Sequence, residues 1–497
     1  MEPVKVALLV SITARAVAAV SGLLALPVYL SFLGVEAYGV VGLFASLQAV
    51  VAFMDFGLAT TLTRQLAATG GDAAAMRQAR DTTLTFECAY LVLSLVVGLV
   101  LTAVAPWVAS TWVNPSGLSV DGVTWSLELA ALALACAWPA NLYCAGMAGQ
   151  HRQVPLAISN GVFALLRVGL SVLFIWHRPS LDSFFWAQLV VSILQSVATR
   201  FQLWQGLAMQ DHRARVRWRV LSGARRFAGG MTAITITSIL LAQSDKLILS
   251  HVLALSEFGI YAVAGTLATG LYVLISPLFS VLYPRLSSVW SSADTRALAE
   301  LYHSGSQTMA VLVMPMAAVL VCFAAPSLYV LTNNAVVSHD AALILVFLTL
   351  GAALNGVMNM PYALQLAAGW TSLSVITNLV AVCLITPLTW WAAVRHGAVG
   401  GAAAWSLLNA AHLLVTPPLL HRRLLKAEKW RWYVQDVLLP AAVSLSVAAL
   451  LATIWPAGLA SRWSTAMQLA ACWLLVTAAT VASVPAMRRA LPRFSWR

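Results

Sequence analysis

Fourteen apolar runs, each long enough to cross a membrane, follow one another along this chain with only short polar or Gly/Pro breaks between them. A membrane-spanning helix needs about 20 predominantly apolar residues. Because 61% of the residues are hydrophobic and only 9% are charged, the composition excludes a soluble enzyme, a disordered scaffold and a nucleic-acid-binding module. The sequence therefore predicts an all-α polytopic membrane protein. The predicted helices cover residues 6–33, 37–62, 83–112, 124–148, 154–176, 183–207, 227–250, 258–283, 306–330, 341–367, 371–394, 398–420, 437–458 and 466–487.

The basic residues predict an orientation. If the N-terminus is cytoplasmic, 22 of the 29 Lys and Arg residues lie in inner segments, and only Arg178, Arg395 and Arg462 lie in outer ones. Short loops rich in Lys and Arg stay on the cytoplasmic side of a membrane. We therefore predict that both termini are cytoplasmic, and that the net charge of +12 reflects topology rather than binding to nucleic acid.

Two stretches about 220 residues apart are similar to each other. The first is YLSFLGVEAYGVVGLFASLQ, from Tyr29, and the second is ILSHVLALSEFGIYAVAGTLAT, from Ile248. Each places an acid and an aromatic-Gly pair in a predicted outer turn between two helices. The second copy begins six helices after the first, so both copies keep one orientation. This pattern predicts a parallel repeat about an axis along the membrane normal, as found among transporters.

The repeat predicts the domain organisation. Residues 1–207 form an N-terminal six-helix lobe, and residues 227–420 form a C-terminal six-helix lobe. The basic cytoplasmic linker 208–226 joins them. A second basic loop, 421–436, precedes residues 437–497, which are expected to form two extra helices and a basic cytoplasmic tail.

A family resemblance rests on three segments: ALPVYLSFLGVEAYGVVGLF, MDFGLATTLTRQLA and QSDKLILSHVLALSEFGIYAVA. They resemble the Wzx-type polysaccharide and O-antigen flippases of the multidrug/oligosaccharidyl-lipid/polysaccharide exporter superfamily, which also holds the MATE exporters and MurJ. The resemblance implies two six-helix lobes around a central cavity and transport by alternating access. It also implies an undecaprenyl-diphosphate-linked oligosaccharide as cargo, moved from the inner to the outer leaflet. Many Wzx proteins have twelve helices, whereas this chain is predicted to have fourteen, as in MurJ.

Four cations lie within predicted spans: Arg15, Arg167, Arg200 and Lys246. Charged side chains at membrane depth are costly, and they mark functional sites by default. Arg offers planar, paired donors that match phosphate oxygens, and it keeps its charge when it is desolvated. We therefore predict that these four residues line the cavity and contact the diphosphate of the cargo.

Acids within the spans allow a second interpretation. Asp55 lies at a depth similar to that of Arg15 on the neighbouring helix, so these two residues could clamp each other instead of binding cargo. Arg200 could reach the inner interface. Asp245 and Lys246 match the family's Asp-basic pair in the seventh helix, and this match implies a role in lobe contact or cargo release. Coupling to H⁺ or Na⁺ through Asp55 or Asp245 is left open.

Polar side chains at helical spacing form stripes on three predicted helices, and they include Gln188, Gln195, Asn355, Asn359 and Asn409. Polar stripes mark helix faces that avoid lipid. Amide-rich walls would suit the hydroxyl groups of sugars. The alternative is that these side chains make hydrogen bonds between helices.

The loops give no support to an enzyme. The longest predicted outer loops, near 113–123 and 331–340, hold one acid each and no DxD, HExxH, Walker or GxSxG pattern. We expect no catalytic residue, no metal and no cofactor other than a coupling ion. The alternative functions are a cation-coupled MATE-like exporter of small molecules, a lipid II flippase, and a scaffold that recruits glycosyltransferases through the basic loops.

The resemblance also implies partners and a location. The expected partners are membrane lipid and a polyprenyl-diphosphate-linked glycan, with a polysaccharide polymerase and glycosyltransferases as further candidates. The expected location is the bacterial plasma membrane, where the chain would act as a monomer.

Overall fold

The computed structural model describes residues 4–52, 57–69, 73–208, 214–218, 237–454 and 461–484. These residues are almost entirely helical, and within them the β structure is limited to one isolated bridge between Asn114 and Ala254. A helix satisfies its own backbone polar groups, and this is why apolar spanning runs adopt it in hydrocarbon. The prediction of an all-α, multi-pass membrane protein is confirmed.

The chain divides into two compact units after Gly259. The first unit contains α1 (Val4–Ala52), α2 (Leu58–Ala67), α3 (Ala73–Trp107), the π-helical η1 (Val108–Trp112), α4 (Val120–Gly149), α5 (Gln153–His177), α6 (Leu181–Gln205), a helix over 237–252, and the beginning of α8 (Leu255–Thr269). The second unit contains the rest of α8, α9 (Leu271–Ser291), α10 (Thr295–Cys322), α11 (Ala324–Thr332), α12 (Ala335–Val357), α13 (Asn359–Ala367), α14 (Thr371–Arg423), α15 (Lys429–Arg431), the π-helical η2 (Trp432–Leu438), α16 (Leu439–Thr453) and α17 (Arg462–Ser483).

Glycines divide two of the long helices. The described residues contain eleven helical segments that are long and apolar enough to span a membrane. Two of these segments, in α1 and α14, each contain two predicted spans. Gly34 (φ 80°) and Gly397 (φ 59°) interrupt the helical backbone between the two spans. Glycine adopts such positive φ angles without steric cost. When the helix at 237–252 is added, the described chain accounts for the fourteen predicted helices.

Polar caps decide where helices begin. The side chain of Ser119 accepts a hydrogen bond from the Gly122 amide at the start of α4 (3.2 Å), as is usual for an N-cap. The side chain of Asn334 accepts bonds from the amides of Val336 (3.0 Å) and Val337 (3.2 Å). Because Asn334 caps α12, this helix begins at Ala335, before the predicted start at 341. The predicted outer loop 331–340 is therefore mostly helical.

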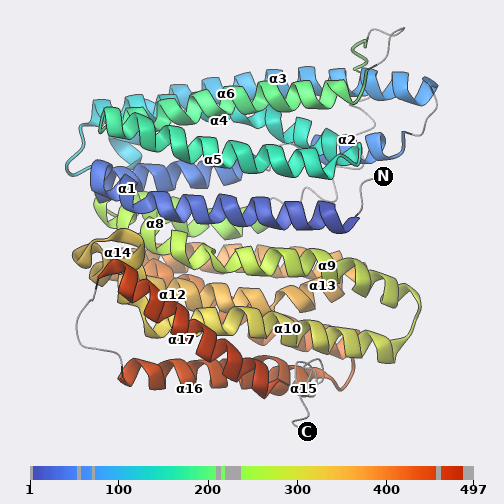
Figure 1. Ribbon diagram of the computed structural model, residues 1–497, viewed down its shortest axis with the longest axis vertical. Helices are drawn as coiled ribbons and strands as arrows, with labels where there is room; N and C mark the ends of the chain where they lie inside the picture. Colours follow the sequence, from blue (N-terminus) through green and yellow to red (C-terminus); the bar gives the residue numbers. More distant parts are fainter. Residues whose placement is uncertain are drawn as a thin grey trace. The chain divides into compact units, whose positions relative to one another are not determined.

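Each unit has a central helix. In the first unit α4 packs against α2, α3 and α6, while α5 packs against α1 and α6 (Figure 1). In the second unit α10 packs against α9, α12, α16 and α17. The two predicted C-terminal helices therefore join the second unit through contacts with α10.

The basic loop predicted at 421–436 is much shorter in the structure. The helix α14 continues to Arg423, and α15 begins at Lys429. The reason is burial: the Trp432 side chain is fully buried and donates a hydrogen bond from Nε1 to Ser306 Oγ on α10 (3.0 Å). A segment that must place this side chain in the core cannot remain an exposed loop.

Two features around the predicted linker differ from a simple solvated connection. The described part of the linker, residues 214–218, docks on α3, because Arg217 forms an ion pair with Asp81 (2.8 Å). The helix at 237–252 belongs to the first compact unit, whereas the sequence repeat predicts that it belongs to the second lobe. Contacts with residues 112–114 hold its end: Trp112 Nε1 donates to Ser250 Oγ (3.1 Å), and Asn114 Nδ2 donates to the His251 carbonyl (2.8 Å).

Candidate functional site

Arg167 on α5 is held by two glutamines of α6. Its Nη1 donates to Gln188 Oε1 (2.7 Å), and its Nη2 donates to Gln195 Oε1 (3.0 Å). The two glutamines are seven residues apart, so they lie on one face of α6. Gln188 is buried, and its Nε2 donates to the buried Ser171 Oγ, one turn after Arg167 (3.1 Å). This arrangement gives the guanidinium group a defined orientation.

The charge of Arg167 is not neutralised by its hydrogen bonds. Both acceptors are neutral amides, and no carboxylate in the described part of the chain forms an ion pair with it. A guanidinium group has five N–H donors, of which these glutamines take two. The site therefore keeps a positive charge and further donors in a fixed plane.

Arg167 and Gln195 line a cavity of about 550 Å³ that lies wholly in the first unit. This volume is within the range of small-molecule binding sites. The walls come from the second part of α1 and from α4, α5 and α6. Alanines provide much of the space, and the polar lining also includes Gln48, Asn141 and Asn160. The cavity thus combines one fixed cation with several amides, and no acid is among its described lining residues.

The comparison with known proteins decides the family. A sequence family described as "Polysaccharide biosynthesis protein" matches residues 31–335, which is more than half of the chain. This chain belongs to that family. The resemblance seen in the sequence is thereby confirmed.

Solved structures related to this family member show the same fold. The lipid II flippase MurJ, in an inward closed conformation, is similar with a TM-score of 0.73 at 12% identity over 95% of this chain and 97% of that chain. An inward-facing MATE multidrug resistance transporter of the MOP superfamily gives a TM-score of 0.66 at 13% identity, over 84% of this chain and 98% of that chain. An outward-facing transporter described in the same words gives 0.56 at 14% identity, over 83% and 96%. No curated protein sequence matches this chain. At these identities the similarity shows the fold alone.

Arg200 has a partner that was not predicted from the sequence. In this polysaccharide biosynthesis family member, Arg200 forms an ion pair with Glu87 on α3. Glu87 is buried, and it also accepts hydrogen bonds from Tyr143 Oη (3.1 Å) and Trp204 Nε1 (3.0 Å). Arg200 is not among the residues that line the Arg167 cavity. The ion pair gives Arg200 a structural role, and its predicted contact with the cargo diphosphate stays a prediction.

Arg15, Asp245 and Lys246 are not among the described residues that line this cavity. Arg15 lies on α1 with an exposed side chain, and Asp55 lies outside the described residues, so the proposed clamp between them stays a prediction. Asp245 is buried on the helix at 237–252, and the neighbouring Lys246 donates to Gln243 Oε1 (3.2 Å). The roles predicted for this pair stay predictions.

The asparagines of the second unit bond to one another and to the backbone. Asn355 Nδ2 donates to Asn409 Oδ1 (3.1 Å), and Tyr272 Oη donates to Asn355 Oδ1 (3.2 Å). Asn359 Nδ2 donates to the carbonyl of Asn355 (3.0 Å), and Asn409 Nδ2 donates to that of Trp405 (2.9 Å). The bonds of Asn355 to Asn409 and Tyr272 join different helices and fit the alternative of helix-to-helix hydrogen bonding, whereas the two bonds to backbone carbonyls each span one turn. Of the predicted sugar-facing residues, only Gln195 lines the Arg167 cavity.

The second unit contains a buried polar cluster that was not predicted from the sequence. His303 on α10 pairs with Asp436 on η2 and, through Nε2, with Glu428 Oε2 (3.0 Å). Gln307, one turn after His303, donates to Asp436 Oδ1 (2.7 Å). The spacing of His303 and Gln307 was a visible signal, but their partner lay in a segment expected to be a loop. The described residues contain no group of three or more His, Cys, Asp or Glu side chains arranged to hold a metal.

Proposed function

We propose that this protein is a flippase that moves an undecaprenyl-diphosphate-linked oligosaccharide from the inner to the outer leaflet of the bacterial plasma membrane by alternating access. The orientation that goes with this proposal places both termini in the cytoplasm. Membership of a polysaccharide biosynthesis family and the flippase and transporter fold support a transport function. The observation that carries the choice of cargo is the Arg167 cavity.

The chemistry of the cavity suits a diphosphate joined to sugar. The planar donors of Arg167 match two oxygens of one phosphate group, and charge-assisted bonds of this kind are stronger than neutral ones. Gln188 and Gln195 hold the guanidinium in place, so little side-chain entropy is lost when the cargo binds. The amides of Gln48, Asn141 and Asn160 provide donors and acceptors for hydroxyl groups. In this proposal the chain provides binding and passage, and it catalyses no reaction.

The same cavity disfavours a cation-coupled exporter of cationic compounds. A fixed positive charge repels a cationic substrate, and no acid is among the described lining residues to offset it. A lipid II flippase would use the same diphosphate chemistry, so the identity of the sugar separates these two cargo classes. We propose a polysaccharide polymerase and glycosyltransferases as functional partners, and we expect the chain to act as a monomer.

The test is a flipping assay in proteoliposomes that contain a lipid-linked oligosaccharide. The Arg167→Gln variant should flip the cargo about 10- to 100-fold more slowly, because a hydrogen bond to a charged group contributes about 1.5–3 kcal/mol. Arg167→Lys should be intermediate, since it keeps the charge but loses the paired donors. Arg178→Gln is the matched control, because Arg178 follows the end of α5 with an exposed side chain. Wild-type flipping by a folded Arg167→Gln variant would contradict the proposal.

A second readout separates the exporter alternative. The same proteoliposomes are loaded with a cationic dye in place of the lipid-linked oligosaccharide. We expect no dye transport by the wild type. Dye transport that rises in Arg167→Gln would favour the exporter.

A further inference from the structure

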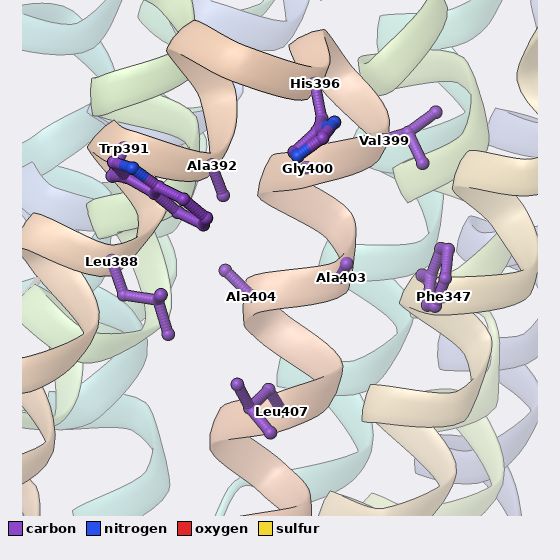
Figure 2. Close-up of a pocket in the computed structure, with 10 residues that line it drawn as sticks. All are labelled: Phe347, Leu388, Trp391, Ala392, His396, Val399, Gly400, Ala403, Ala404 and Leu407. Carbon is purple, nitrogen blue, oxygen red and sulfur yellow. The ribbon is translucent and has the colours of Figure 1, made fainter.

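A groove lies between the two halves of α14 in the second unit (Figure 2). Its volume is about 420 Å³, which is sufficient for part of a ligand of ordinary size. Its lining includes Leu388, Trp391 and Ala392 from the first half of α14 and Ala404 and Leu407 from the second half. Phe347 of α12 borders the other side. We call this feature the α14 groove.

The backbone explains why the groove forms. Gly397 interrupts α14 with φ 59°, and the two halves then lie against each other at Gly400, where an added Cβ would be only 2.1 Å from the carbonyl oxygen of Ala392. Beyond this close contact the second half presents Ala403 and Ala404, whose small side chains do not fill the space. Figure 2 shows Leu388 and Ala404 facing each other across the opening.

The walls of the groove are apolar and open to the surroundings. Trp391 is 51% exposed and Leu407 is 58% exposed. Leu384, one turn before Leu388, is 67% exposed. In a membrane protein such surface lies in contact with lipid chains, so an acyl chain can enter the groove without crossing a polar barrier.

A cation and an aromatic ring mark the end of the groove near Gly397. The guanidinium carbon of Arg395 lies 5.6 Å from the centre of the Trp391 ring, and the His396 ring meets the same indole edge-on at 6.2 Å. Arg395 has no carboxylate partner in the described part of the chain. Tryptophan is enriched at the depth of the lipid headgroups, and basic side chains near the membrane surface attract anionic headgroups. An anionic headgroup is therefore complementary to this rim, above an apolar groove.

We propose that the α14 groove binds an anionic phospholipid, with its phosphate at Arg395 and one acyl chain between the halves of α14. This inference does not depend on the proposed function, because Arg395 and the groove lie in the second unit and the Arg167 cavity lies in the first. Zwitterionic lipid fits the apolar walls equally well but gains less from the cation. The cation of Arg395 therefore favours an anionic headgroup, and the apolar groove accepts one acyl chain.

The test is native mass spectrometry of the full chain during titration with dioleoyl-phosphatidylglycerol or dioleoyl-phosphatidylcholine. The wild type should retain one phosphatidylglycerol with about fivefold or higher preference over phosphatidylcholine, as expected for one arginine beside an anionic headgroup. Both lipids present a phosphate to Arg395, but the choline cation of phosphatidylcholine offsets its charge. Arg395→Gln should abolish this preference. Ala404→Leu should lower the retention of that lipid, because the added side chain fills the groove.

Matched variants control for general effects. Arg178→Gln removes another exposed arginine from the predicted outer side, and Ala471→Leu enlarges an exposed alanine of α17 outside the groove. Both should retain lipid as the wild type does. Equal retention of the two lipids by the wild type, or unchanged preference in Arg395→Gln, would overturn the proposal. Arg395→Gln changes an exposed side chain, so this variant tests the proposal even if Ala404→Leu fails to fold. Displacement of phosphatidylglycerol by undecaprenyl diphosphate would also overturn it, because the groove would then belong to the cargo.

Discussion

Glu87 on α3 and Arg200 on α6 form a salt bridge between side chains that are 113 residues apart in the sequence. The carboxylate is almost completely buried, and it also accepts bonds from Tyr143 on α4 and Trp204 on α6. One acid thus ties three helices of the first unit together. Arg200, whose side chain is 52% exposed, is the outer member of this cluster.

Glu87→Ala should therefore destabilise the first unit more than Arg200→Gln does. Removing the buried carboxylate leaves the Tyr143 and Trp204 donors without their acceptor, and we expect a loss of about 3 kcal/mol because each unsatisfied buried donor costs about 1–3 kcal/mol. Removing the arginine should cost less, about 1 kcal/mol, because its side chain is half-exposed and Glu87 keeps the hydrogen bonds from Tyr143 and Trp204. Unfolding in detergent, followed by tryptophan fluorescence, measures both. Arg200→Gln should also keep flipping; a loss of flipping at unchanged stability would return Arg200 to the cargo site.

Gly39 and Gly259, the glycines of the two aromatic-Gly pairs in the sequence repeat, lie at a close backbone contact within the first unit. An added Cβ at Gly259 would be 2.0 Å from the carbonyl oxygen of Val35, and one at Gly39 would be 2.6 Å from that of Leu255. Gly259→Ala must therefore move the backbone, and we expect a loss of about 3 kcal/mol or failure to fold, at the upper end of overpacking costs. Gly265→Ala is the control, since its nearest neighbour would be 3.9 Å away. Equal melting temperatures for the two variants would refute this account.

Glu36 holds the segment that follows η1. Its carboxylate accepts hydrogen bonds from the backbone amides of Ser116 and Gly117, the latter at 2.9 and 3.0 Å. Glu36→Ala should speed amide exchange at these two residues about 10- to 100-fold, because bonds to a charged acceptor contribute about 1.5–3 kcal/mol. Hydrogen–deuterium exchange with peptide-level mass spectrometry measures this. Asp121→Asn is the control, because Asp121 is a nearby exposed acid and its loss should leave the exchange rate unchanged. Equal effects of the two variants would show that Glu36 does not specifically hold these amides.

Asp436 fastens the C-terminal helices to α10. It is fully buried, and it receives bonds from His303 and Gln307. Asp436→Ala should cost about 3 kcal/mol and raise amide exchange through η2 and α16. Glu428→Gln is the control, because the Glu428 side chain is 28% exposed and should contribute much less. If Asp436→Ala left exchange in α16 unchanged, the contact would not be what holds that helix.

Some features of the structure could be predicted from the sequence, and others could not. Gly34 and Gly397 lie at two predicted helix breaks, because a positive φ is a local property that glycine signals. Arg167 is one of the four cations predicted to lie within spans and to line a cavity, and in the structure it lines one with Gln195. The prediction of a loop over 421–436 was wrong, because the burial of Trp432 depends on Ser306 in another helix.

The sequence by itself determined the membrane class, the number of helices, the internal repeat and the family, because these follow from the length and order of apolar runs and from local motifs. Only the tertiary structure decided which charges have partners. Arg167 and Arg200 look alike in sequence, yet one is held by neutral glutamines in a cavity and the other is paired with Glu87. The physical reason is that an ion pair depends on distances of a few ångströms between helices, and these distances arise only when the helices pack.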